Sequence, residues 1–456
     1  MSENITRKFD IKYRDEYDVI VIGGGTAGSI AGIAAASKGA STLIIENQSY
    51  LGGSATGAQV TPMMSTEISG DPDCSAISKE IKKRMIENNN VSGKNEESNR
   101  WFNPEMLKFT LEKMYIENGG EILYDTRLID TIVKDNDISE IIIHNKSGMQ
   151  SIKGKVFIDG TGDAEVANLA GAPCLEGPEN KKYSSQSVSL RFMMGNIEID
   201  ILKNYLEEIG QEGASNSDLL HTAMVWEGNW VLEDIFQQGV DEGVLKYEDG
   251  EYFQAFSVPG MPGVLSFNCP EIPDEVNPFN DKDISQSYIK GREMIKRISR
   301  FLQEYIPGFK KSYVMAVAPM LGVRESRRIE GEYLLNMQDH NHRAQFDDVI
   351  ARTAYPVDIH GMDEEEIEID RYGKGDYMEV PFRSLIPKKI NNLLVVGRSI
   401  SSTFVIQSAI RIQPTCRATG EAAGLGAVNA VRNNIDVRNV DGVKIKEQMQ
   451  DWGADL

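Results

Sequence analysis

The residues with the clearest chemical meaning form a glycine-rich turn between a strand-like run and a helix-like run. The β-branched run Val19–Ile22 leads into Gly23, Gly25 and Gly28, an Ala-rich stretch follows, and the next apolar run ends at Glu46. This order is the βαβ pattern that binds dinucleotides. The glycines permit a tight turn, close approach of a pyrophosphate and close packing of the helix on the strand. The helix N-terminus then offers free N–H groups and a positive dipole end to the phosphates.

Glu46 is the predicted contact of the adenosine ribose. Its carboxylate can accept hydrogen bonds from ribose hydroxyls and would repel a 2′-phosphate, so the pattern favours FAD or NAD over NADP. A glycine motif alone would be a weak signal. Here the strand, the turn, the helix and an acid about 20 residues further on occur together, and this context makes the prediction specific.

The composition describes a folded globular protein and argues against several classes of partner. The chain has 456 residues, of which 41% are hydrophobic and 26% are charged, so roughly two or three packed units are expected. The net charge of -21 and the lack of a Lys/Arg-rich run disfavour binding to nucleic acid or to anionic membranes. No apolar run approaches the ~20 residues of a membrane span.

The cysteine and histidine content predicts a cytoplasmic protein without a metal site. The four cysteines stand apart and form no Cys-x-x-Cys pair, which suits a reducing compartment. The start of the chain, Met1 to Tyr17, is polar and lacks the apolar segment of a signal peptide. His340 and His342 lie in a polar stretch without further ligands, so we interpret them as loop residues.

Two further strand-to-glycine transitions are expected near the first one. Lys155–Asp159 runs into Gly160–Asp163, and Leu393–Val396 runs into Gly397. The small-residue loop Leu51–Gly57 starts at the carboxyl end of a strand, where doubly wound sheets bind ligands. A helix of small residues, Thr419–Ala430, follows and is suited to close contact with a neighbouring element.

Between these motifs the sequence predicts one well-capped helix and an antiparallel hairpin. Asn103 can cap a helix that starts at Pro104 and ends before Gly119-Gly120. Strands are expected over residues 121–124, 129–133 and 138–144, with a polar hairpin tip at residues 134–137.

The middle of the chain has a different character. Alternating runs at Ser187–Met194 and Tyr252–Val258, a hairpin closed by residues 259–263, and helices at 201–209 and 284–304 predict an inserted α+β domain. We therefore expect a cofactor-binding domain formed by residues 1–177 and 383–456, interrupted by a substrate domain at 178–382.

These separated motifs, in this order, resemble those of the FAD-dependent oxidoreductase family whose fold is shared with fumarate reductase and succinate dehydrogenase flavoproteins. The resemblance covers about residues 15–432 and includes the stretch Gly322–Arg328. It implies an α/β fold with a Rossmann-like FAD-binding domain of the glutathione-reductase-type two-dinucleotide-fold flavoprotein superfamily. It also implies the inserted α+β substrate domain.

The resemblance implies a set of FAD contacts. Leu128 would contact adenine through its backbone, and the helix opening near Thr419-Gly420 would point at the flavin N1–C2 edge, where a reduced flavin carries negative charge. The implied contacts are Gly23, Gly25, Thr26, Ala27, Gly28, Glu46, Asn47, Gly52, Gly53, Ala55, Thr56, Leu128, Gly162, Asp163, Gly397, Arg398 and Gly420.

Two departures from related flavoproteins refine this expectation. Covalent flavoproteins of the fumarate reductase type carry a histidine just before the Gly-Gly loop, whereas the stretch Asn47–Gly53 has none. We therefore predict non-covalent FAD. No second Gly-x-Gly-x-x-Gly motif follows the first, so a dedicated NAD(P)H domain is not expected and the electron donor or acceptor stays open.

The hypothesis for the reaction is hydride transfer between a small organic substrate and flavin N5, with the substrate held between the two domains. Arg324 is the first candidate to anchor an anionic substrate, because a guanidinium pairs bidentately with a carboxylate. The alternative for Arg324 is a structural ion pair with Glu325, Glu330 or Glu332.

Arg411 is a second candidate for the anion, and His360 is a candidate general acid or base. The alternative for His360 is a structural histidine.

Other functions stay open at this point. They are a flavin-dependent monooxygenase, an FAD-binding subunit of a larger redox complex, and a flavin-dependent RNA-modifying enzyme, although the acidic balance disfavours the last. A homo-oligomer is compatible with the sequence.

Overall fold

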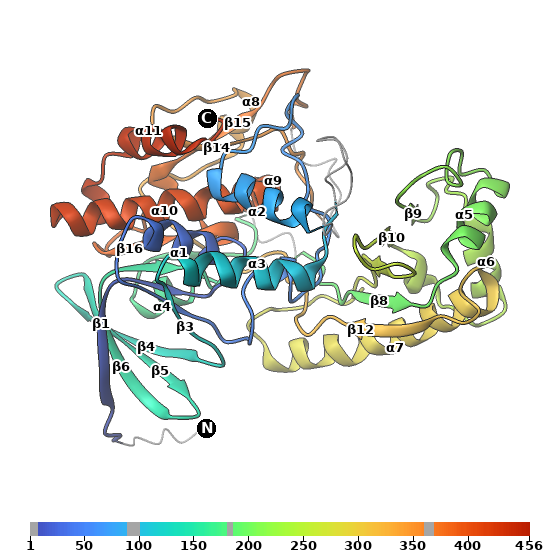
Figure 1. The fold of residues 1–456 in the computed structure, drawn as a ribbon, viewed down its shortest axis with the longest axis horizontal. Coiled ribbons are helices and arrows are strands. Elements are labelled where there is room, and N and C mark those ends of the chain that lie inside the picture. The colour runs from blue at the N-terminus through green and yellow to red at the C-terminus, as the bar shows by residue number, and fades with distance from the viewer. Residues whose placement is uncertain (1–7, 89–100, 180–185, 360–368) are drawn as a thin grey trace.

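The computed structural model describes residues 8–88, 101–179, 186–359 and 369–456. These residues form two lobes (Figure 1). The first lobe contains a large sheet with long helices beside it, and both ends of the chain contribute to it. The second lobe is built from the middle of the chain and carries its own sheet.

The sheet of the first lobe has seven strands among the described residues, with β1 and β6 at its centre. The segment Val19–Ile22 at the end of β1 is at most 3% exposed, because the sheet is covered on both faces. β1 pairs in parallel with β2 and β6, β3 pairs in parallel with β2, and β16 pairs in parallel with β6, while β4, β5 and β6 form an antiparallel meander. The strands are β1 (Lys12–Ile22), β2 (Thr42–Ile45), β3 (Glu121–Leu123), β4 (Arg127–Lys134), β5 (Asp137–Asn145), β6 (Gly148–Asp159) and β16 (Leu393–Val395).

The predicted hairpin between β4 and β5 is confirmed. Asp135 and Asn136 at its tip have φ values of 51° and 68°. Two successive positive φ values are typical of the tight turns that match the twist of paired strands.

Helices α1 (Gly28–Ser37) and α10 (Gln413–Asn433) pack closely in the first lobe. A Cβ atom at Gly424 would lie 2.5 Å from the carbonyl oxygen of Ala31 and 2.6 Å from Cβ of Ala34. The predicted start of this helix near Thr419-Gly420 is wrong, because the helix begins at Gln413. Pro414 is accommodated there because the first turn needs no N–H partner from within the helix.

The remaining elements of the first lobe lie around this pair. Asn103 caps α3 as predicted, and its Oδ1 accepts a hydrogen bond from the backbone N–H of Glu105 at 3.0 Å. The remaining helices of the first lobe are α2 (Ala76–Glu87), α3 (Pro104–Glu117), α4 (Glu165–Leu169), α8 (Met337–Asn341), α9 (Phe404–Ile410) and α11 (Gly442–Trp452). Two short antiparallel pairs join β7 (Cys174–Glu176) to β13 (Arg327–Ile329) and β14 (Val349–Thr353) to β15 (Met378–Pro381).

The second lobe is a five-stranded antiparallel sheet with helices against one face. The predicted hairpin is confirmed, with Ala255 opposite Phe267. The strands, in spatial order, are β12 (Tyr313–Val317), β8 (Phe192–Gly195), β11 (Leu265–Phe267), β10 (Phe253–Ser257) and β9 (His221–Met224), and the helices are α5 (Ile199–Glu208), α6 (Glu233–Asp241) and α7 (Asp281–Tyr305).

Each lobe has its own hydrophobic core. Residues of the predicted inserted domain, 178–382, contribute to both cores. The fully buried residues of the second core run from Val188 to Leu321. Leu335, Met378 and Phe382 instead pack in the core that contains α1 and α10. The last part of the segment 178–382 therefore packs with the first lobe. Within the described ranges, no helix is both long and apolar enough to cross a membrane.

Replacing Gly424 by Ala should lower the free energy of unfolding. Overpacking a core costs roughly 1–3 kcal/mol, which outweighs the gain of about 1 kcal/mol from removing a glycine inside a helix. Urea unfolding measures the change. Gly373→Ala is the control, since its added methyl group would lie 3.5 Å from its nearest neighbour, Oδ2 of Asp376. Equal or higher stability of the Gly424 variant would contradict this account of the helix contact.

Candidate functional site

The backbone of the turn between β1 and α1 packs against itself and against the turn after β6. Gly23 has a φ of +88°, and a Cβ atom there would lie 2.6 Å from the backbone of Gly160. A Cβ atom at Gly28 would lie 1.9 Å from the carbonyl oxygen of Gly23. Both positions therefore require glycine for the fold itself, as the sequence pattern predicts.

Gly25 differs from these two glycines. A Cβ atom there would lie 3.6 Å from the carbonyl oxygen of Gly160 and 3.8 Å from Cα of Gly53, which are ordinary contacts. Its φ is outside the left-handed region. Contacts within the described chain do not demand a glycine at this position, so the close approach of a pyrophosphate stays the predicted reason for it.

Glu46 lies at the end of β2 and is 7% exposed. Its Oε2 accepts a hydrogen bond from the N–H of Gly24 at 2.8 Å, and its Oε1 accepts one from the N–H of Gln48 at 2.8 Å. Burial raises the pKa of Glu46, while these backbone donors act in the opposite direction. Each carboxylate oxygen has a second lone pair with which to accept a ribose hydroxyl. The neighbouring Asn47 is exposed.

The loop after β2 is tied to the glycine turn. The N–H of Gly52 donates to the carbonyl of Gly24 at 2.9 Å, and the hydroxyl of Thr26 donates to the carbonyl of Gly52 at 3.1 Å. The structure thus places Gly53 against Gly25, and Ala55 follows in a short 3-10 helix. The hydroxyl of the buried Thr56 donates to the carbonyl of Leu51 at 2.7 Å.

Arg398 joins the turn after β6 to the stretch Gly322–Arg328. Its Nε donates to the carbonyl of Gly162 at 2.7 Å, its Nη1 to the carbonyl of Val323 at 2.6 Å, and its Nη2 to Oδ1 of Asp163 at 2.9 Å. Ser326 also donates to Oδ1 of Asp163, at 2.6 Å. Three predicted residues, Gly162, Asp163 and Arg398, therefore form one hydrogen-bonded unit.

Gly397 and Gly420 both lie beside Ala27 at the start of α1. A Cβ atom at Gly397 would be 3.3 Å from Cβ of Ala27, and one at Gly420 would be 2.2 Å from its carbonyl oxygen. The hydroxyl of Thr419 accepts a hydrogen bond from the N–H of Gly397 at 3.0 Å. Because α10 begins at Gln413, Gly420 lies inside the helix and packs on α1, and it does not form the helix N-terminus that the sequence placed at the flavin.

Among the predicted cofactor contacts, Leu128 lies on the strand that is farthest from β1 in the order of the sheet. It lies on β4 opposite Ile143 and is 8% exposed. The segment before it approaches Glu46, because the N–H of Thr126 donates to the carbonyl of Glu46 at 3.0 Å. Leu128 is therefore near the end of the site predicted to hold adenosine.

Arg324 forms a partly buried ion pair between separate parts of the chain. Its Nη2 pairs with Oε1 of Glu271, and its Nη1 donates to the carbonyl of Ser187. Arg324 thus forms an ion pair, but its partner is none of the three glutamates expected from the sequence, and its role as a substrate anchor stays a prediction. Glu325 pairs instead with Arg328 at 3.2 Å.

Arg411 lies at the end of α9, just before α10, and is linked to Arg324. Its Nη2 donates to Oε1 of Gln186 at 3.3 Å and pairs with Oδ2 of Asp358 at 3.2 Å. Nε2 of Gln186 donates to Oε1 of Gln407 at 3.4 Å, and Nε2 of Gln407 donates to the carbonyl of Arg324 at 3.0 Å. The structure thus brings both predicted arginines into one network. His360 lies outside the described residues.

Buried polar atoms without a hydrogen-bond partner gather near the N-terminus of α10. They include Nε of Arg411 and Oγ1 of Thr415 within the described part of the chain. Gln413 attaches this helix end to the segment after the Gly52-Gly53 loop, because its Nε2 donates to the carbonyls of Val60 and Pro62 at 3.0 and 2.8 Å. Oγ1 of Thr61, between them, is also buried and unpartnered.

Arg191 is a functional candidate that the sequence reasoning missed. It directly precedes β8 and is 8% exposed, and its Nη1 is buried without a partner. Burial lowers the pKa of Arg191 to about 10; Tyr252 opposes this shift and the positive charge of Arg324 adds to it. The available signal was a single charged residue inside the otherwise uncharged run Ser187–Met194.

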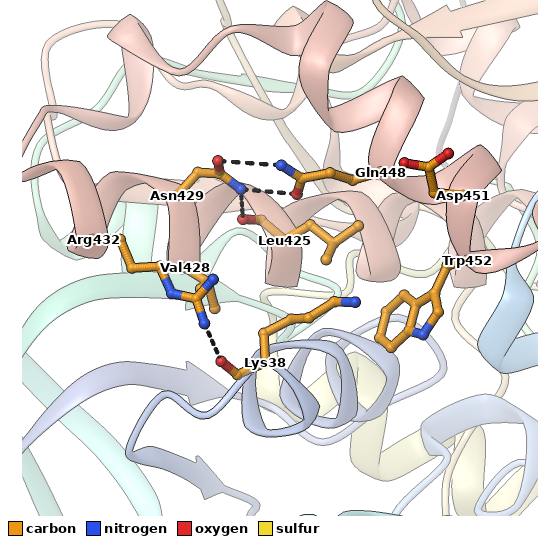
Figure 2. A pocket seen from close by; sticks show the side chains of 8 residues that line it. All are labelled: Lys38, Leu425, Val428, Asn429, Arg432, Gln448, Asp451 and Trp452. Carbon is orange, nitrogen blue, oxygen red and sulfur yellow. Dashed lines mark hydrogen bonds between the residues drawn. The ribbon is translucent and has the colours of Figure 1, made fainter.

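A cavity of about 280 Å³ lies away from these residues, between the end of α1, α10 and α11 (Figure 2). Nζ of Lys38 lies 3.8 Å from the ring centre of Trp452, and Arg432 donates to the carbonyl of Lys38. None of the predicted cofactor or catalytic residues lines this cavity.

The donors and acceptors around the β1–α1 turn fit a dinucleotide. Helix α1 begins at this turn, and a helix N-terminus suits phosphate oxygens, although the N–H groups of Ser29 and Ala31 already donate to the carbonyls of Gly25 and Ala27. The carboxylate of Glu46 suits hydroxyl groups, and the small residues at Gly23 and Gly28 keep the turn tight enough for the backbone to reach a ligand.

Comparison with known proteins identifies relatives that match parts or all of this chain. Digeranylgeranylglycerophospholipid reductase 1 of Methanococcoides burtonii is 24% identical over 195 residues, covering 41% of this chain and 47% of that protein. The Methanococcus aeolicus digeranylgeranylglycerophospholipid reductase is 26% identical over 203 residues, covering 42% and 48%. The matched region spans about half the length of these curated relatives.

Two solved structures illustrate the similarity at the level of the whole chain. A geranylgeranyl bacteriochlorophyll reductase-like protein from Thermoplasma acidophilum is 14% identical, with a TM-score of 0.46 and coverage of 96% of this chain and 83% of that one. The flavin-dependent brominase Bmp2 is also 14% identical, with a TM-score of 0.46 and the same coverage of 96% and 83%.

The profile of the family described as FAD dependent oxidoreductase matches residues 18–449, which include both lobes and every segment of the glycine-rich site. The chain belongs to the FAD dependent oxidoreductase family.

Proposed function

We propose that this enzyme transfers hydride between a small organic substrate and non-covalently bound FAD, at the junction of the two lobes. The observation that carries the proposal is the network from Arg324 through Gln407 and Gln186 to Arg411. It joins the start of the second lobe to the N-terminus of α10 and so puts cationic side chains beside the helix end nearest the Gly52-Gly53 loop.

The first lobe supplies the cofactor contacts in this proposal. N–H groups at the start of α1 bind the pyrophosphate, Glu46 binds the ribose, and the turn at Gly162-Asp163 is held in place by Arg398. Bound FAD supplies the hydride acceptor or donor at its flavin ring. The N-terminus of α10 at Gln413, rather than Gly420, provides the positive dipole end for the flavin edge.

Residues at the junction orient the substrate. The guanidinium groups of Arg324 and Arg411 each hold an acidic partner in the described chain, so their N–H groups are fixed in direction before a substrate arrives. Burial lowers the pKa of Arg411; Asp358 opposes this shift and the charge of Arg324 adds to it. His360 stays the proposed proton donor or acceptor.

Within the family, we propose the glutathione-reductase-type dinucleotide fold and the fumarate reductase-like branch as the finer assignment. A flavin-dependent monooxygenase, which the sequence left open, is the second candidate. Rapid NAD(P)H oxidation by oxygen that an aromatic substrate stimulates would favour the monooxygenase. Anaerobic bleaching of the flavin by a substrate would favour simple hydride transfer.

Acid precipitation of the purified, FAD-loaded protein should release the flavin into the supernatant. The reason is that the stretch before Gly52-Gly53 holds no histidine for a covalent link. Absorption spectra of supernatant and pellet measure the outcome. Flavin that stays in the pellet would show a covalent link, and a protein that takes up no FAD at all would remove the proposed function.

Replacing Gly25 by Ala should weaken FAD binding without unfolding the protein. The added methyl group meets only ordinary contacts in the chain but would obstruct a pyrophosphate. Loss of hydrogen bonds to a charged group costs about 1.5–3 kcal/mol, which corresponds to about 10- to 100-fold in Kd. Flavin fluorescence titration gives the affinity, and urea unfolding without FAD gives the stability.

Gly28→Ala is the matched comparison, since its methyl group would lie 1.9 Å from the carbonyl oxygen of Gly23 and should destabilise the fold itself. Undiminished FAD affinity of the Gly25 variant would place the pyrophosphate elsewhere.

A further inference from the structure

Arg191 is a buried arginine of the junction that has no acidic partner among the residues described. Arg324 pairs with Glu271 and Arg411 pairs with Asp358, whereas no ion pair or hydrogen bond of the Arg191 guanidinium occurs among the residues described. Its side chain is nevertheless buried, with 8% of the residue exposed. Burying a charge without a partner is costly, so an isolated arginine here needs a reason other than stability.

The strand register shows which surface Arg191 belongs to. Phe192 is opposite Phe267 in this antiparallel pair. Arg191, just before β8, is therefore opposite Asn268, just after β11. Asn268 is in turn bonded to Gln254 on the next strand, through its N–H at 2.9 Å and its Nδ2 at 3.1 Å. Phe192 and Phe267 pack in the core of the second lobe, and side chains alternate along a strand. Arg191, Asn268 and Gln254 therefore lie on the opposite face.

The same face also carries apolar side chains. Met193 is 3% exposed and belongs to a small cluster separate from the main core of this lobe. Phe256 lies 5.8 Å, between ring centres, from Trp101 of the first lobe. This face therefore meets the first lobe, and it combines one unpaired guanidinium with apolar surface.

We infer that Arg191 binds the carboxylate of a substrate whose remaining part is apolar. The inference rests on the proposed function, because it names the substrate class of the same junction. A guanidinium forms two parallel hydrogen bonds with a carboxylate, and the surrounding low dielectric strengthens them. Ser189, two residues before Arg191, exchanges backbone hydrogen bonds of 3.2 and 2.8 Å with Gly322, two residues before Arg324, so the two arginines lie on adjoining segments. Among the described residues the nearby Glu271 is already paired with Arg324, and the carboxylate of the ligand supplies a direct acidic partner for Arg191.

The test compares hexanoate with hexanamide on the FAD-loaded protein. These two probes have the same chain length and differ in charge. Calorimetric titration should show tighter binding of hexanoate to the unaltered protein, and Arg191→Met should weaken that binding at least about tenfold, as expected for a charged hydrogen-bonded contact. Arg191→Lys should bind hexanoate with intermediate affinity, because a lysine keeps the charge but lacks the two-pronged geometry.

A second readout separates a binding role from a structural one. Without any carboxylate, Arg191→Met should raise the unfolding temperature, because it replaces an unpaired buried charge by an apolar side chain of similar length. Arg300→Met is the control, since Arg300 is exposed on α7 and pairs with Glu304 one turn along the same helix. It should change neither the hexanoate affinity nor the unfolding temperature appreciably.

Several results would overturn the inference. They are equal binding of hexanoate and hexanamide, a lower unfolding temperature of Arg191→Met with unchanged hexanoate binding, or sulfate competing as well as hexanoate. Retention of a normal flavin spectrum in such a case would leave the proposed function intact. Failure of the unaltered protein to bind FAD would instead refute the proposed function, independently of Arg191.

Discussion

The whole arrangement depends on the close approach of backbone segments that carry no side chain at the point of contact. Gly23 meets the turn after β6, Gly28 meets Gly23, and Gly420 and Gly424 of α10 meet the backbone of α1. A methyl group at these positions would lie within 2.6 Å of another atom. Overpacking at this distance destabilises the fold, so these contacts constrain where the β1–α1 turn and α10 lie.

The second level of organisation is polar and joins the lobes. Arg398 unites the turn after β6 with the segment leading out of the second lobe, and the Gln186–Gln407 contact unites that lobe with α9. The Gln186–Gln407 contact is buried and the Arg398 bonds are partly buried, and a missing partner costs more there than in water. The two lobes thus meet at a polar junction where Arg324 and Arg411 are each held by an acidic partner. Arg191 differs from them, because its guanidinium has no acidic partner among the residues described.

Local patterns predicted local structure well. The cap at Asn103, the hairpin at Asp135-Asn136 and the glycine turn depend on residues within a few positions of each other, and all three are found. The start of α10 was misplaced because only the run of small residues from Thr419 was taken as the helix, whereas Gln413 and Pro414 already belong to its first turn. The partner of Arg324 was misjudged for a different reason: Glu271 lies far away along the chain, and nearby glutamates are equally acidic.

The sequence by itself determined the dinucleotide turn, the family and the division into two kinds of unit, because these follow from spacing, β-branched runs and glycines in a fixed order. The tertiary structure decided which charged residues meet. It assigned Gly420 to helix packing and drew Leu335, Met378 and Phe382 into the core of the first lobe. It also left Arg191 buried without an acidic partner among the residues described. The physical reason is that ion pairs and burial depend on distances between segments remote in sequence. The sequence states which charged residues exist, but it does not state which of them are buried together.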